Sequence, residues 1–269
     1  MGKVIGVIAV KGGVGKTTIS SSLAADLANN HGKKVLLIDA NYSAPNVGLH
    51  MDIVKPEKTI HDVLSDSSTI KSAIHTSFGV DVIPGSFIAQ RHFNPLKLKD
   101  KLQGIKEKYD FIILDSAPGM SEEVLSTVLA SDNLFIVTTP DFPTLSCSFK
   151  AAKLAKHKGK EVDGIIINKI RDPNYEINLE DIENFVEAPV VARIPDEKEH
   201  VRALYTRVPM SLYNSKSKFA KEIHKLSTAL VGKTEEVSFW KTILPYSFKR
   251  EEVNRQMLKE SFYSSVFEE

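Results

Sequence analysis

The sequence of 269 residues contains a single cysteine, Cys147, and no long hydrophobic run. One cysteine excludes an internal disulfide and, within one chain, a cysteine cage for zinc or for an iron–sulfur cluster. The longest apolar runs, such as VIGVIAV at 4–10, are far shorter than the ~18 residues that span a bilayer. The N-terminus lacks a signal-peptide pattern, and the formal net charge is only +1. These absences predict a cytoplasmic protein that is not, as a whole, a polyanion binder.

Short apolar segments of strand length recur along the chain, and most are continuous rather than alternating. Continuous runs are typical of strands buried on both faces of a parallel sheet. Segments with helical spacing separate them, as at 17–30, which is followed by Gly32. The pattern predicts an α/β fold, with a doubly wound, mostly parallel sheet and helices on both faces, over residues 1–232. A C-terminal tail follows at 233–269, and the predicted strands lie at 4–10, 35–38, 80–83, 111–114, 134–138, 164–167 and 190–194.

The segment AVKGGVGKTT at 9–18 follows the first predicted strand and opens the first predicted helix. A phosphate-binding loop needs this context. Its glycines allow backbone N–H groups to turn toward phosphate oxygens, and the helix N-terminus adds further donors. Lys16 is expected to reach the β- and γ-phosphates, and Thr17 to ligate Mg²⁺. The predicted phosphate-binding set is Gly12, Gly13, Val14, Gly15, Lys16, Thr17 and Thr18.

Position 10 departs from the general phosphate-loop pattern, because Val10 replaces glycine and is followed by an extra lysine, Lys11. With these residues the sequence resembles the MinD/ParA family of dimerising P-loop ATPases, and within it the MinD-like (septum site-determining) branch. The resemblance covers most of residues 1–232. The other segments that carry it are LLIDANYSAPNVGLHM (36–51), VDVIPGS (80–86), YDFIILDSAPG (109–119), TTPDFPTLSCSFKAAKL (138–154), IINKI (166–170) and IPDEKEHVRAL (194–204).

The resemblance implies an ATPase that uses ATP and Mg²⁺ and forms a homodimer with ATP. Lys11 would then cross the dimer to the nucleotide of the other subunit; the alternative is an ordinary surface lysine. Asp115, at the end of a strand, would hold a magnesium-bound water. Asn168 would contact the adenine, and Pro195 and Asp196 would lie near the base.

The segment VLLIDANYSAPN at 35–46 carries one carboxylate where two are expected. By the resemblance, Asp39 matches the first aspartate of switch I, near the metal, and Asn41 stands in the place of the catalytic aspartate. An amide can position water but supplies neither a base nor a charge. Phosphoryl transfer depends mainly on positioning and electrostatics, so we expect hydrolysis to persist at a rate lower by ~10²-fold. The alternative is that another acid takes over the role. The predicted catalytic residues are Lys11, Lys16, Asp39 and Asn41, and the metal ligands Thr17, Asp39 and Asp115.

Lysines at 150, 153, 156 and 160 recur with helical spacing. Such a stripe is typical of a solvated helix face, and the alternative is a surface for DNA or for a membrane.

The tail contains two contrasting segments. FWKTILPYSFKR at 239–250 combines aromatic and aliphatic residues with basic ones and no acid, which is typical of an interfacial membrane anchor. The last twenty residues carry five acids against three bases, which better suits a protein groove or packing on the protein's own core. Val253, Met257, Leu258, Phe262, Val266 and Phe267 form their predicted apolar stripe. Disorder is the third alternative.

For the biological output, the resemblance favours a switch that positions cell machinery, such as that of cell division, at a membrane surface. A second reading is a DNA-partitioning ATPase, which would use a basic dimer surface and bind DNA with an affinity that falls steeply with salt. A third is an ATP-binding scaffold that scarcely hydrolyses ATP and recruits partners through residues 233–269.

Overall fold

A sheet of eight strands forms the centre of the computed structural model, which describes residues 2–88, 92–172, 176–233 and 250–264. The strand order is β3-β4-β2-β5-β1-β6-β7-β8. Neighbouring strands are parallel except for the pair β3 and β4. All seven predicted strands are present within a few residues of their expected bounds. The strands are β1 (Lys3–Ile8), β2 (Val35–Ala40), β3 (His75–Ser77), β4 (Val80–Ile83), β5 (Phe111–Ser116), β6 (Asn133–Thr138), β7 (Gly164–Ile170) and β8 (Val190–Pro195).

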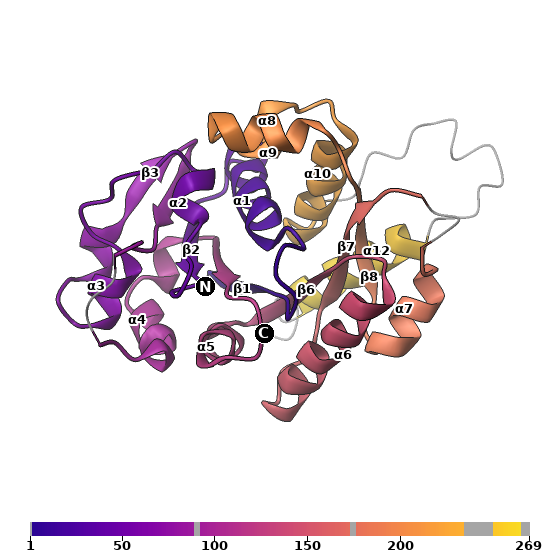
Figure 1. The fold of residues 1–269 in the computed structure, drawn as a ribbon, viewed down its shortest axis with the longest axis horizontal. Helices are drawn as coiled ribbons and strands as arrows, with labels where there is room; N and C mark the ends of the chain where they lie inside the picture. The colour runs from indigo at the N-terminus through magenta and orange to yellow at the C-terminus, as the bar shows by residue number, and fades with distance from the viewer. Residues whose placement is uncertain (1, 89–91, 173–175, 234–249, 265–269) are drawn as a thin grey trace.

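Helices cover both faces of this sheet, with α1 and α10 on one side and α5, α6 and α7 on the other (Figure 1). Successive residues of a strand point to opposite faces. In β5, Phe111 and Ile113 belong to the core beneath α1, whereas Ile112 and Leu114 belong to the core on the other face. The predicted doubly wound α/β fold is confirmed. The α-helices are α1 (Lys16–His31), α2 (Val47–His50), α3 (Ile60–Leu64), α4 (Leu98–Gln103), α5 (Glu122–Ala130), α6 (Phe142–His157), α7 (Leu179–Val186), α8 (Glu199–Thr206), α9 (Met210–Tyr213), α10 (Lys218–Leu230) and α12 (Arg250–Ser264), and the 3₁₀ helices are η1 (Ile70–Ala73), η2 (Pro95–Lys97) and η3 (Lys106–Lys108).

Helix α1 connects the phosphate-binding loop to the opposite end of the domain. It ends at His31 because Gly32 adopts the left-handed conformation, with φ of 63°, and donates its N–H to the carbonyl of Ala28. The next N–H, of Lys33, bonds to the carbonyl of Leu27, so the last turn closes as a Schellman-type cap. Glycine meets the left-handed requirement at no steric cost. The helix predicted at 17–30 therefore has its expected end.

Two expectations differ from the structure. Strand β3 was not predicted, because it has three residues and owes its conformation to antiparallel pairing with β4. The four lysines do not form one stripe, because α6 ends at His157 and Lys160 lies beyond it. Lys160 donates instead to the carbonyl of Ser131, at 2.7 Å. Lys156 pairs with Glu187 at 3.2 Å.

The C-terminal helix α12 packs against β8 and α10. Leu258 and Phe262 are buried in the core shared with α1, whereas Val253 and Met257 of the predicted stripe are 41% and 61% exposed. The buried face of α12 thus differs from the predicted one, because polar side chains also dock it, as Asn254 does by donating to the carbonyl of Val190 at 2.8 Å. Strand β8 is the last in the sheet order, so α12 covers an otherwise open edge.

The proposed anchor at 239–250 lies outside the described residues except for Arg250, and so do Val266 and Phe267. Among the described residues, no helix combines the length and the apolar character needed to cross a membrane.

Candidate functional site

The loop between β1 and α1 depends on glycine at two positions. Gly13 and Gly15 have φ of 76° and 97°, in the region that favours glycine. At Gly15 a second constraint applies, because a Cβ there would lie 2.3 Å from Nδ2 of Asn168. The left-handed turn and the close approach of β7 therefore both require glycine at 15.

The end of β7 holds this loop through two side chains. Asn168 donates from Nδ2 to the carbonyl of Val14, and Lys169 donates from Nζ to the carbonyl of Gly13, each at 2.7 Å. The other amide atom of Asn168, Oδ1, is buried and accepts no hydrogen bond from the described residues. A buried acceptor without a partner is costly, and the exocyclic amino group of adenine is a donor that would satisfy it. Asn168 therefore fits an adenine nucleotide.

Two buried carboxylates face each other at the ends of β2 and β5. Asp39 and Asp115 are paired in the strand register, at a strand spacing of about 4.8 Å. Asp115 accepts from the hydroxyls of Thr17, at 2.6 Å, and Ser20, at 3.0 Å. The role of Ser20 was not predicted from sequence; its position one helical turn after Lys16 was the available signal.

Burial raises the pKa of Asp39 to about 8, and the neighbouring charge of Asp115 adds to the shift. Burial also raises the pKa of Asp115, against the opposing effects of Thr17, Lys16 and Ser20. Two adjacent carboxylates and a threonine hydroxyl are the hard oxygen donors that Mg²⁺ prefers, and a divalent cation would offset their repulsion. The donor set therefore fits Mg²⁺, with Thr17, Asp39 and Asp115 as the residues that would hold it directly or through water.

A cavity of about 1130 Å³ is lined by Thr17, the partner of Asp115, whereas Asp39 and Asp115 themselves are buried and do not line it. It is large enough for a nucleoside triphosphate. Lys16 faces it and is only 7% exposed; burial lowers the pKa of this lysine, while Asp115 opposes the shift. The predicted residues that line the cavity are Gly12, Gly13, Gly15, Lys16, Thr17, Thr18, Asn41, Asn168, Pro195 and Asp196.

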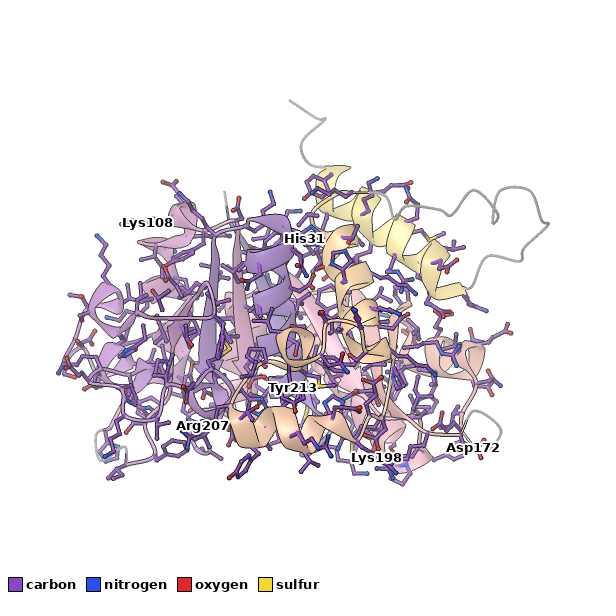
Figure 2. All side chains as sticks on the ribbon, turned by 90° about the horizontal axis from the view of Figure 1, so that it is seen from above. His31, Lys108, Asp172, Lys198, Arg207 and Tyr213 are labelled. Carbon is purple, nitrogen blue, oxygen red and sulfur yellow. The ribbon has the colours of Figure 1, made fainter. Side chains whose placement is uncertain are left out.

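Pro195, the last residue of β8, and Asp196, which follows it, line the cavity together with residues of α8. Asp196 is oriented by an ion pair with Arg171 at 2.7 Å and by its N–H, which donates to the carbonyl of Ile170. Figure 2 shows Lys198 and Arg207, which flank α8, at the edge of the molecule opposite His31. The side chain of Val14 does not face the cavity but belongs to the core, so only its backbone is available to a phosphate.

The switch I loop is organised by Asp39 rather than by Asn41. Asp39 accepts from the backbone N–H groups of Asn41, Asn46 and Val47, at 3.1, 2.8 and 2.9 Å. Asn41 uses its Nδ2 to close the loop on the carbonyl of Ala44, at 2.6 Å. The amide stabilises the loop from within, whereas a carboxylate at this position could not donate.

A second contact holds the same loop from outside. Glu123, in the first turn of α5, accepts hydrogen bonds from the hydroxyl and the N–H of Ser43. This contact joins residues 80 positions apart, and sequence reasoning did not find it. Besides Asp39, Glu123 is thus a second acid that is hydrogen-bonded to this loop.

Lys11 points away from its own loop and toward α6. Its Nζ donates to the hydroxyl of Thr144 at 2.8 Å and lies 3.6 Å from the carboxylate of Asp141. Asp141 caps α6 by accepting from the N–H of Thr144. Lys11 remains 47% exposed, so a surface ion pair tethers it without burying it.

Known ATP-binding proteins are similar to this chain in sequence and in fold. A protein-family model described as an AAA domain matches residues 2–148. The chain is 31% identical over 240 residues to an uncharacterized ATP-binding protein of Methanocaldococcus jannaschii, covering 88% of this chain and 90% of that protein. It is 30% identical over 246 residues to the septum site-determining protein MinD of Thermotoga maritima, covering 86% and 89%.

Among solved structures, the chain is similar to MinD of Pyrococcus horikoshii complexed with Mg-ADP. The TM-score is 0.78 at 28% identity, and the match covers 84% of this chain and 95% of that one.

Proposed function

Because the chain belongs to the MinD/ParA family of P-loop ATPases, which use ATP and Mg²⁺, we propose that it is a slow, ATP-dependent homodimerising switch that positions cell machinery. The position of Lys11 supports dimerisation most directly. A phosphate-loop lysine that faces away from its own cavity and stays exposed is available to the nucleotide of a second subunit.

Within one subunit, the described residues have different roles in nucleotide binding and hydrolysis. Lys16 and the loop backbone bind the phosphates, and Asn168 selects the base. Thr17, Asp39 and Asp115 would hold Mg²⁺, which would supply positive charge beside the phosphates. Asn41, at the cavity wall, orients a water molecule through its amide oxygen. Its Nδ2 is already engaged with Ala44.

Slow turnover follows from this arrangement. Asn41 supplies neither a base nor a negative charge, and Glu123 is occupied by Ser43. Hydrolysis then depends on positioning and on the charge of Lys11 from the partner subunit. The expected consequence is an ATP dimer that lasts longer than that of a relative carrying aspartate.

Light scattering tests the dimer. Mg·ATP should convert the wild-type monomer into a dimer, ADP should not, and Lys11→Ala should stay monomeric. Lys34→Ala is a matched control, because this exposed lysine follows α1 and lies outside the phosphate loop. A Lys11→Ala protein that still dimerises with ATP would contradict the proposed role.

The biological role requires a second experiment, because three roles remain to be distinguished: membrane positioning, DNA partitioning and scaffolding. Co-sedimentation with anionic liposomes and with DNA, each with ATP and each repeated without residues 233–269, separates them. Membrane positioning predicts liposome binding that needs ATP and the tail. DNA partitioning predicts salt-sensitive DNA binding without need of the tail. Binding to neither supports the scaffold.

A further inference from the structure

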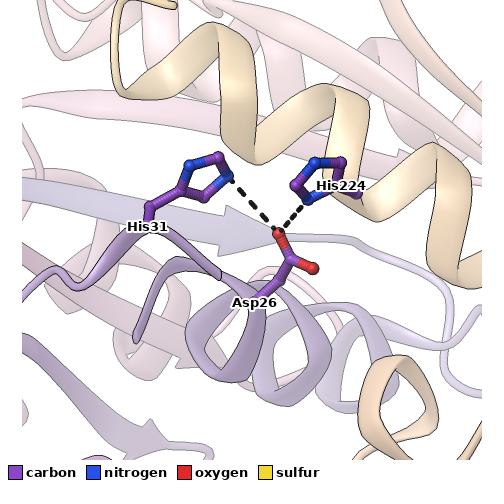
Figure 3. A group of neighbouring side chains, drawn as sticks. All are labelled: Asp26, His31 and His224. Atoms are coloured by element: carbon purple, nitrogen blue, oxygen red, sulfur yellow. Dashed lines mark hydrogen bonds and ion pairs between the residues drawn. The ribbon is translucent and has the colours of Figure 1, made fainter. Parts of the chain in front are cut away.

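A group of nitrogen and oxygen donors lies at the end of α1 that is remote from the nucleotide. Asp26 and His31 come from the last turns of α1, and His224 comes from α10 (Figure 3). One donor atom of each side chain lies within 4.8 Å of the other two. His31 lies fourteen residues after Thr17 in the same helix, which corresponds to about 20 Å. The group is therefore separate from the site that would hold Mg²⁺.

We propose that Asp26, His31 and His224 form a binding site for a late first-row divalent cation such as Zn²⁺. Imidazole nitrogen and carboxylate oxygen are ligands that zinc accepts. The same set discriminates against Mg²⁺, which prefers oxygen ligands alone and retains its water. Two histidines and one carboxylate leave at least one coordination position for water.

The distances already approach those of a coordinated ion. Ligand atoms at ~2.0–2.1 Å from a tetrahedral zinc lie about 3.3 Å apart. Oδ2 of Asp26 is 3.1 Å from Nδ1 of His224 and 3.6 Å from Nε2 of His31. The third pair, between the two imidazoles, lies within 4.8 Å and must close further.

The side chain of His224 is the one that must move to bring the two imidazole nitrogens closer together. The two rings are nearly parallel, at 6°, with centroids 5.1 Å apart, and a metal must lie close to the plane of each ring that ligates it. One ring must therefore turn about its Cβ–Cγ bond. The side chain of His31 is 4% exposed and that of His224 is 49% exposed, so His224 has the room to turn.

The surroundings hold the carboxylate and provide access. Asn30 donates to Oδ1 of Asp26 at 2.6 Å, which leaves Oδ2 directed at the histidines and acts as an outer support of the ligand. The hydroxyl of Ser227 lies 2.9 Å from Nε2 of His31 and donates to Oδ2 of Asp26; the ion would replace these hydrogen bonds.

A cavity of about 740 Å³ reaches the cluster from solvent and is lined by Asp26, Asn30 and His224. Positive side chains also line it, and one of them, Lys225, is paired with Glu222 at 2.6 Å. An ion bound at the cluster would join the C-terminal end of α1 to α10.

Calorimetric titration of the tag-free, chelator-treated full-length protein with ZnCl₂ tests the site, with excess Mg²⁺ present to occupy the oxygen donors at the other end. We expect one equivalent to bind, and His224→Ala to weaken binding at least about tenfold, since even outer supports of metal ligands contribute about 10–100-fold. His157→Ala is the matched control, because this exposed histidine ends α6 and lies outside the cluster.

A second readout protects against a folding artefact. Zn²⁺ should raise the Tm of the wild-type protein and of His157→Ala equally, and at the same zinc concentration should raise the Tm of His224→Ala by less. Since His224 is half-exposed, its replacement should preserve the fold, which circular dichroism verifies. Absence of zinc binding, or binding that His224→Ala leaves intact, overturns the proposal.

Discussion

The two ends of helix α1 each place a buried aspartate among polar side chains, but with different partners. At the phosphate loop, Asp115 is surrounded by the hydroxyls of Thr17 and Ser20 and by the amine of Lys16. At the other end, Asp26 is approached by the imidazoles of His31 and His224. Oxygen donors suit Mg²⁺, whereas imidazoles suit zinc-like ions. The two ends of one helix thus lie beside donor sets that suit different metal ions.

The ends also differ in how they are assembled. The nucleotide end depends on a contiguous motif, 9–18, completed by the ends of β2, β5 and β7. The remote end depends on α10 and α12, which come from the last quarter of the chain. Substitutions at one end of α1 that leave the other end intact therefore test whether the two ends are independent.

The largest expected effect concerns stability at the remote end. Phe262 is 1% exposed, so Phe262→Ala should lower the free energy of unfolding by about 3–5 kcal/mol, the usual range for a buried aromatic residue. Met257→Ala on the exposed face of α12 should change it by less than about 0.5 kcal/mol. Urea denaturation measures both. Equal effects would mean that α12 does not pack as described.

Lys16→Ala should weaken the binding of Mg·ATP at the nucleotide end of α1. Removing a buried charge that faces the phosphates should cost about 2–5 kcal/mol, or at least about 30-fold in affinity for Mg·ATP, measured by calorimetry. Lys34→Ala, an exposed lysine just after α1, is the control and should bind ATP normally. Unchanged affinity in Lys16→Ala would remove the basis of the proposed site.

Asn41→Asp adds a third carboxylate at the nucleotide end and should accelerate ATP hydrolysis there, which would separate the two ends of α1 further. Hydrolysis in a single turnover should rise at least about tenfold, at the lower edge of what a positioned base contributes. Single-turnover conditions remove the effect of slow product release. Asn46→Asp, in the same loop, should not accelerate hydrolysis. If Asn41→Asp is no faster and Asp39→Asn alone abolishes turnover, Asp39 is the catalytic residue.

The smallest effect is expected at the tether of Lys11. Asp141→Asn removes the ion pair but keeps a side chain able to cap α6. Exposed pairs contribute about 0.2–1 kcal/mol, so release of Lys11 should tighten the ATP-dependent dimer by no more than about fivefold for each of its two lysines. Sedimentation equilibrium at several concentrations measures this shift. A weaker dimer would instead indicate that Asp141 contributes to the dimer contact.

Much of the fold was predictable because its signals are local. Continuous apolar runs marked seven strands, and Gly32 marked the end of α1, since each depends on the preferences of neighbouring residues. The three-residue β3 was missed because its conformation comes from its partner strand. The buried face of α12 was misjudged because apolar spacing does not reveal that Asn254 satisfies the carbonyl of Val190 on an edge strand.

The segment of the phosphate loop, the aspartates at the strand ends and the amide at 41 could be predicted from the sequence, because these residues lie next to elements that order and spacing define. The contacts between side chains from distant positions depend instead on the tertiary structure. It brought Glu123 to Ser43, Asp141 to Lys11 and His224 to Asp26. The reason is physical: local preference acts over a few residues, whereas a pairing across nearly two hundred exists only once the helices have packed on the sheet.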